Sequence, residues 1–179
     1  MQNRSHPSIL NANLASLDAE IARIEEKYDV LAGVAIGQAA FPFRAQQATW
    51  QGGTLRGGPA LATIDVPIAL AVLADSKQPP DANYLFNRAL ADDSAAGDEA
   101  LWAFLGTPEQ AAEKTTQALR TFGDWRTVVS STSVIGRDAP YLQTQWTLES
   151  QSKVAGAMLC DYVVVHPVLS KLNDPAADP

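Results

Sequence analysis

Apolar side chains recur every three or four residues in several parts of the chain, and this spacing is typical of α-helices. After the capping residue Ser16, one helical face carries Leu17, Ile21, Ile24 and Tyr28, opposite a charged face. Residues 64–73 are almost wholly apolar, which predicts a helix buried on all sides. Four further helices are expected, over residues 84–90, 95–105, the stretch after a capping box at 107–110, and 147–160.

Two segments rich in small and β-branched residues predict strands instead. Residues 31–39 and 44–50 are expected to pair as an antiparallel hairpin. Residues 127–129 are β-prone, and 163–169 predict a short strand or a turn before a last helical piece. Because no repeat or linker divides the chain, we predict a single α+β domain over 1–179, with a mostly helical body and a small antiparallel sheet. Its polar ends, 1–12 and 173–179, are expected to be disordered.

The composition narrows the classes of function. Of 179 residues, 46% are hydrophobic and 18% charged, so the chain can bury a core. The formal net charge of -7 repels phosphate and argues against nucleic acid and anionic membranes as partners. No apolar run approaches the roughly 20 residues of a spanning helix, so no membrane span is expected. No apolar stretch follows the first six residues, so no signal peptide is expected in this chain.

Side chains for metal or cofactor chemistry are scarce. The single cysteine, Cys160, permits no internal disulfide and no Cys-rich zinc site, and there are only two histidines. The glycines of residues 52–58 are not followed by the Gly-Lys-Ser/Thr of a phosphate-binding loop. We therefore predict no metal and no cofactor.

One short string has the spacing of a catalytic pair. Ser150 and Lys153 form an S-x-x-K string, and residues three apart share a helix face. The predicted helix around them is amphipathic, however, with an apolar stripe at Leu148, Ala155, Met158 and Leu159. This pattern favours a solvent-exposed face over a nucleophile, which would need a buried helix start and an oxyanion hole.

The predicted buried helix resembles part of a known family. Residues 58–71 read GPALATIDVPIALA. This stretch resembles the active-site helix of the serine β-lactamase and penicillin-binding-protein superfamily, and most of all the β-lactamase-like exported proteins of actinobacteria. In that superfamily, S-x-x-K supplies a nucleophilic serine and, one turn later, a lysine that helps to activate it. Here Ala62 stands at the serine position and Asp65 at the lysine position.

Three later segments resemble the same family in the same order. They are DSAAGDEALW at 93–102, LRTFGDWRT at 119–127 with its Gly-Asp, two residues, Thr turn, and TQWTLESQ at 144–151. The second superfamily motif, S-D-N, falls on Asp93, Ser94 and Ala95, so it is degenerate too. The nearest string to the third motif, K-T-G, begins at Lys114; it lacks the glycine and lies in a predicted helix. The chain ends where these relatives would supply their last strands.

The resemblance implies a degenerate member of the superfamily, a pseudoenzyme. Acyl transfer needs a nucleophile and an activator, and the family positions for both are substituted. We therefore expect a non-catalytic protein that acts by binding or as a structural component, exported to the cell envelope, with a ligand that the sequence does not name. The alternative is a serine hydrolase of peptidoglycan-like or β-lactam amides that uses a relocated serine, Ser94 or Ser150.

Two features of the structure are expected from this alignment. Asp65 should be at least partly enclosed and hydrogen-bonded, for example to Arg44, Arg56 or a backbone N–H. The predicted hairpin of residues 31–50 would be flanked in the family by late strands that this chain lacks, which leaves an open edge. Either 127–129 or 162–165 adds a strand, or a second molecule does, and we expect a homodimer that buries the sheet side.

Overall fold

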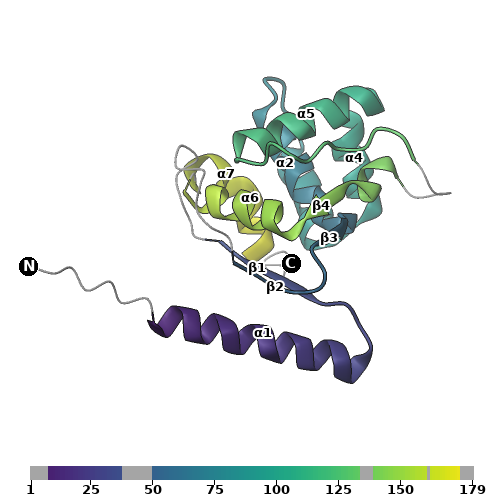
Figure 1. Ribbon diagram of the computed structural model, residues 1–179. Coiled ribbons are helices and arrows are strands. Elements are labelled where there is room, and N and C mark those ends of the chain that lie inside the picture. The colour runs from purple at the N-terminus through teal and green to yellow at the C-terminus, as the bar shows by residue number, and fades with distance from the viewer. Residues whose placement is uncertain (1–7, 38–49, 134–138, 161, 174–179) are drawn as a thin grey trace, which may run out of the picture.

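A computed structural model describes residues 8–37, 50–133, 139–160 and 162–173. Most of the described residues are helical, and the strands form two antiparallel pairs, which confirms the predicted α+β class with a mostly helical body (Figure 1). The helices are α1 (Ser8–Tyr28), α2 (Asp65–Ala74), α3 (Ala82–Phe86), α4 (Ala95–Phe104), α5 (Pro108–Thr121), α6 (Leu148–Cys160) and α7 (Tyr162–Asn173). The remaining elements are β1 (Gly33–Ile36), β2 (Trp50–Gly53), β3 (Gly57–Pro59), β4 (Gln145–Thr147) and the helical turns η2 (Leu61–Ile64), η3 (Asn87–Ala91) and η4 (Pro140–Gln143).

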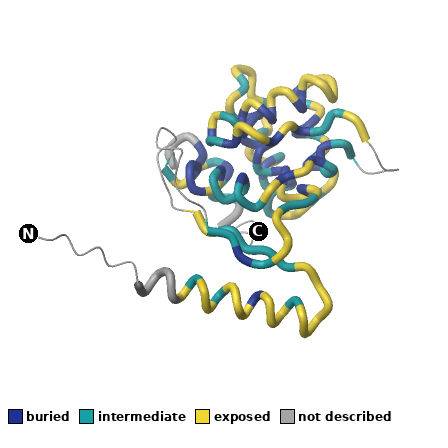
Figure 2. Tube along the Cα trace, in the orientation of Figure 1, coloured by how far each residue is buried: buried dark blue, intermediate teal, exposed yellow. Residues whose placement is uncertain are grey.

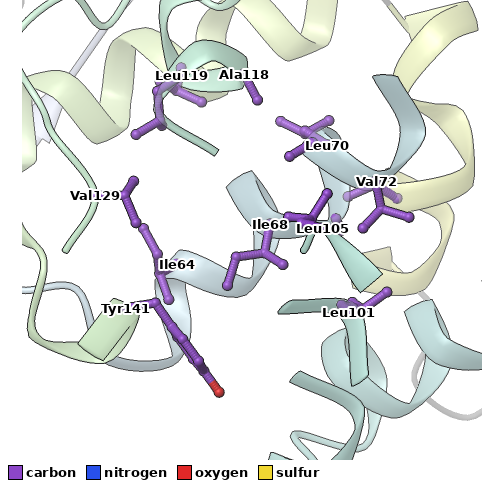
Figure 3. Close-up of a cluster of buried hydrophobic side chains, with 14 of the residues drawn as sticks. Ile64, Ile68, Leu70, Val72, Leu101, Leu105, Ala118, Leu119, Val129 and Tyr141 are labelled. Carbon is purple, nitrogen blue, oxygen red and sulfur yellow. The ribbon is translucent and has the colours of Figure 1, made fainter. Parts of the chain in front are cut away.

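The helical body is built around α2, as its apolar sequence predicts. Helices α4, α5 and α7 pack against it, and Figure 2 shows that buried residues are concentrated there. One continuous core joins these elements, and Figure 3 shows part of it, with side chains that include Ile64, Ile68, Val72, Leu101, Leu105 and Leu119. Pro67 lies in the first turn of α2, where its missing N–H has no helical partner to lose, so the helix runs unbroken.

Helix α5 begins at the capping box that the sequence predicts. The Thr107 Oγ1 atom accepts the backbone N–H of Gln110 at 3.4 Å, and Gln110 Oε1 accepts the backbone N–H of Thr107 at 2.9 Å. The string that begins at Lys114 therefore lies inside a helix, as expected. The ammonium group of Lys114 forms an ion pair with Asp75 at 2.8 Å, at the end of α2.

The N-terminal elements form a layer of their own, with α1 lying along the β1–β2 pair and away from the helical body (Figure 1). Gly33 of β1 lies opposite Gly53 of β2. Asp18 of α1 accepts the N–H of Gly53 at 3.1 Å, and Glu25 accepts the N–H of Ala32 at 2.8 Å. The opposite side of β1 packs against α6. This small sheet therefore has a helix on either side.

Four details differ from the sequence predictions. Helix α1 starts at Ser8, so residues 8–12 are helical rather than disordered, and α7 extends through Asn173. The second strand is 50–53 rather than 44–50, of which 44–49 lie outside the described residues. Residues 127–129 form no strand. Residues 163–169 belong to α7: Val165 and Val168, one turn apart, are fully buried, and a short apolar run does not by itself distinguish strand from helix.

Candidate functional site

Ala62 and Asp65, the two positions that the resemblance singled out, lie at the junction of η2 and α2. Strand β3 leads into it, and the N–H of Ala60 donates to the carbonyl of Thr144 at 2.8 Å. Leu61 follows with φ of 48°, a left-handed conformation that costs a branched residue about 1 kcal/mol or more. Ala62 is then exposed at the helix start, whereas Asp65, one turn later, is only 2% exposed. The backbone thus presents position 62 to solvent and position 65 to the interior.

Asp65 is enclosed as expected, but one of its oxygens is not satisfied. The Oδ1 atom has no hydrogen-bond partner among the described residues. Of the two arginines considered as partners, Arg56 is exposed and Arg44 lies outside the described residues. Burial, together with the smaller effects of the neighbouring charges of Asp98 and Asp93, raises the pKa of Asp65 to about 8.

A second buried carboxyl group faces the same region from α4. Asp98 is 7% exposed, and its Oδ1 atom also has no partner among the described residues. Burial raises its pKa to about 6, with smaller contributions from Asp93 and Glu99. The buried Tyr141 of η4 lies in the same field: burial, then Asp98, Asp65 and Glu99, raise its pKa above the ordinary value. Sequence analysis missed Asp98 and Tyr141, since neither falls on a motif position.

The positions of the second motif lie in the turn before α4. Asp93 is exposed and has φ of 49°, and Ala95 begins the helix. The Ser94 hydroxyl accepts a hydrogen bond from the guanidinium of Arg88 at 2.8 Å. A guanidinium is protonated at any ordinary pH, so it gives Ser94 no general base. The structure therefore brings Asp93 into electrostatic contact with Asp65, but it does not activate the displaced serine.

Ser150 is in a different place from the one the sequence suggests. It is 4% exposed rather than on a solvated face, because the buried side of α6 carries Ser150, Val154 and Met158, while Leu159 points outward. Its hydroxyl donates to Asp124 at 3.0 Å. The ammonium group of Lys153 instead binds Glu149, one turn earlier on the same helix. The two ends of the S-x-x-K string thus have different partners.

Asp124 is the best-satisfied acid of the described core, and sequence analysis gave it no role. It is 1% exposed, and its carboxylate accepts hydrogen bonds from the N–H groups of Arg126 (3.1 Å) and Thr127 (3.2 Å), the indole of Trp146 (2.9 Å) and the Ser150 hydroxyl. Burial alone would raise its pKa, but the Thr127 side chain, the N–H groups of Arg126 and Thr127 and the Ser150 hydroxyl hold it below the ordinary value. The Gly-Asp, two residues, Thr pattern marked this turn, and an aspartate that bonds its own following backbone is its chemical signature.

The surroundings of the motif positions offer little for metal chemistry. Among the described residues, no three His, Cys, Asp or Glu side chains are grouped so that they could hold a metal ion. A mostly apolar groove of about 330 Å³ lies next to η2, lined by Thr63, Val66, Trp146, Gln151, Val154, Ala155, Met158, Leu159 and Leu169.

Within the described residues, no single helix has both the length and the apolar character needed to cross a membrane. Helices α6 and α7 reach that length and apolar character only as a pair, and the pair is bent by 114°.

No protein-family model and no curated protein sequence matches this chain. The chemistry of the site therefore has to be argued from its own residues. They comprise an exposed methyl group at Ala62, two buried acids of raised pKa at Asp65 and Asp98, and a serine at 94 bound to a guanidinium. Such a set can hold and release a proton, but it presents no activated hydroxyl or thiol to an acyl group.

Proposed function

We propose that this chain is a non-catalytic β-lactamase-like protein that acts by binding or as a structural component. The observation that carries the proposal is Ala62. It occupies the family's serine position at an exposed helix start, where a nucleophile would meet substrate, and its methyl group has no oxygen to attack with. Asp65, at the lysine position, is a buried acid beside other acids, so it supplies no amine to remove a proton.

The two relocated serines also support this proposal over the hydrolase alternative. Ser94 is bound by Arg88, which cannot accept its proton. Ser150 is enclosed, and its hydroxyl donates to Asp124, whose lowered pKa makes it a weak base. Neither arrangement combines an accessible hydroxyl with a base of pKa near neutral.

Covalent labelling tests the absence of an acyl nucleophile. A fluorescent penicillin and a fluorophosphonate probe should both leave the folded protein unlabelled, with Ser94→Ala and Ser150→Ala as matched variants. The double variant Ala62→Ser/Asp65→Lys should also stay unlabelled, because the other motif positions, Asp93 and Ala95, remain substituted. Labelling of the unaltered chain that disappears in either serine variant would establish the hydrolase alternative.

The location in the cell envelope comes from the family resemblance. If the protein works there, antibody detection in fractionated cells of the source organism will find it outside the cytoplasm. Recovery from the cytoplasmic fraction alone would contradict the location and leave the argument about Ala62 untouched.

We propose that the partner in solution is a second copy of the chain. Strands β1 and β2 pair only with each other within the described residues, and Leu31, just before β1, is 73% exposed. An open strand edge beside an apolar side chain is typical of an assembly surface. Light scattering at micromolar concentration should report a dimer that Leu31→Lys dissociates, whereas Tyr84→Lys, at a 61% exposed position on α3, should not. A monomer at every concentration would contradict this partner.

A further inference from the structure

Two carboxyl groups from different helices are enclosed together where α2, α4 and η4 meet. Asp65 and Asp98 are both more than nine-tenths buried, and each has an Oδ1 atom that accepts no hydrogen bond from the described residues. Tyr141 of η4 closes the junction, with its ring 4.8 Å from that of Trp102 on α4. Figure 3 shows the Tyr141 ring beside Ile64, with its hydroxyl directed away from the aliphatic cluster. Such an enclosure does not tolerate two ionised carboxylates without compensation.

The charges acting on this pair are all acidic. Asp93, in the turn before α4, acts on both carboxyls, and Glu99 of α4 acts on Asp98. Two basic groups on neighbouring elements have other partners: Arg88 of η3 binds Asp92 and Ser94, and Lys114 of α5 binds Asp75. The other titratable groups on elements packed against α2 and α4 are not among the causes of either shift: Tyr84, Glu109, Glu113, Arg120, His166 and Lys171.

We propose that Asp65 and Asp98 form a proton-operated latch that holds the first turn of α4 and η4 against the start of α2. With a proton on at least one carboxyl, the three elements pack as the structure shows them. When both carboxyls ionise, their repulsion and their need for water separate the first turn of α4 and η4 from α2. The latch is a property of the packing, and it operates whether or not the chain has catalytic activity.

The direction of the pH effect follows from the sign of the shifts. Both folded-state pKa values, about 8 for Asp65 and about 6 for Asp98, lie above the value of 3.8 for a free aspartate. The folded state therefore holds more protons than the unfolded state between about pH 4 and pH 8. The contribution of the latch is fully present below about pH 4 and is lost as the pH rises through the two folded-state values. The closed form is therefore favoured under mildly acidic conditions, and the open form is favoured under alkaline conditions.

The test compares the unaltered chain with Asp65→Asn, Asp98→Asn and the double variant, and uses Asp81→Asn on the exposed surface as the matched control. Thermal unfolding is followed from pH 5 to pH 9, together with amide hydrogen exchange of residues 93–98 and 139–144, corrected for intrinsic rate. We expect the melting temperature of the unaltered chain and of Asp81→Asn to fall across this range, with loss of protection in both segments. In the double variant, the melting temperature and the protection of the two segments should both stay nearly constant across this range. An undiminished pH dependence in the double variant would overturn the latch.

A second measurement keeps the proposal testable if the variants do not fold. Carbon-13 NMR of the aspartate carboxyl groups in the unaltered chain should show two that titrate with midpoints above pH 5. If every aspartate carboxyl group titrates below pH 5, the latch does not exist.

Discussion

Two buried aspartates of this chain have pKa values that are shifted in opposite directions. Asp124 and Asp65 are equally enclosed, at 1% and 2% exposure. Asp124 accepts hydrogen bonds from two backbone N–H groups, an indole and a hydroxyl, and its pKa lies below the ordinary value. Asp65 has an oxygen without a partner among the described residues and lies near other acids, and its pKa is raised to about 8.

The difference shows that burial by itself does not fix the state of a carboxyl group. Both aspartates lose water when the chain folds, and this loss disfavours their charged forms. At Asp124 the donors replace that water, so the charged form persists and ties the 124–127 turn to β4 and α6. At Asp65 no described residue donates a hydrogen bond to Oδ1, so burial favours the neutral, protonated form of the group.

The largest expected effect is the loss of the Asp124 acceptor. Asp124→Ala leaves the Trp146 indole, the Ser150 hydroxyl and two backbone N–H groups without their partner, and it should lower the free energy of unfolding by about 3–5 kcal/mol. Urea denaturation at pH 7 measures this, and Asp81→Ala on the exposed surface is the control. A loss below about 1 kcal/mol would mean that water or other groups satisfy these donors as well as Asp124 does.

The dependence of stability on pH should report both Asp124 and the pair formed by Asp65 and Asp98. The contribution of Asp124 is present above its unfolded value of 3.8 and is lost as the pH falls through its lower folded value. Those of Asp65 and Asp98 are lost in the other direction, as the pH rises toward about 8 and about 6. Thermal unfolding should therefore reach its highest midpoint on the acidic side of neutrality, at about pH 4–6. A maximum at pH 8 would show that the raised values are wrong.

Removing one donor from Asp124 should have an intermediate effect. Ser150→Ala deletes one of several hydrogen bonds to a carboxylate, which should lower the free energy of unfolding by about 1–2 kcal/mol and move the Asp124 pKa upward. The control is Ser152→Ala on the same helix, whose hydroxyl donates to the carbonyl of Glu149. Equal losses in the two variants would show that the Asp124 bond is no stronger than an ordinary one.

Adding one donor near Asp65 should have the smallest effect. Ala62→Ser places a hydroxyl three residues before Asp65, at the exposed helix start. If that hydroxyl turns inward and bonds to the carboxylate, the new bond should stabilise the fold by about 0.5–1.5 kcal/mol at neutral pH. The pKa of Asp65 should fall toward its ordinary value, which carbon-13 NMR measures directly. An unchanged pKa would show that the exposed hydroxyl does not reach the carboxyl group.

The sequence predicted the elements whose signals are local. The apolar run of α2 and the capping box at Thr107 needed no knowledge of distant residues. Asp65 was expected to be enclosed because of its place on that run. Its neighbour Asp98 lies 33 positions later in the sequence, and the packing of α4 against α2 contributes to its burial. Ser150 was assigned to solvent for the same reason, since its partner Asp124 comes from a turn 26 positions earlier.

The attachment of α1 has a consequence for how the chain folds and opens. Of residues 13–28, only Ile21 is buried, and a helix of this length is marginal in water on its own. α1 is synthesised before β2, yet Asp18 finds its backbone donor at Gly53 in β2, and Glu25 finds one of its donors at Thr54, directly after β2. A two-stranded ribbon without that helix is marginal in turn. The N-terminal layer should therefore form late, in one cooperative step, and exchange its amide hydrogens as one unit while the helical body stays closed.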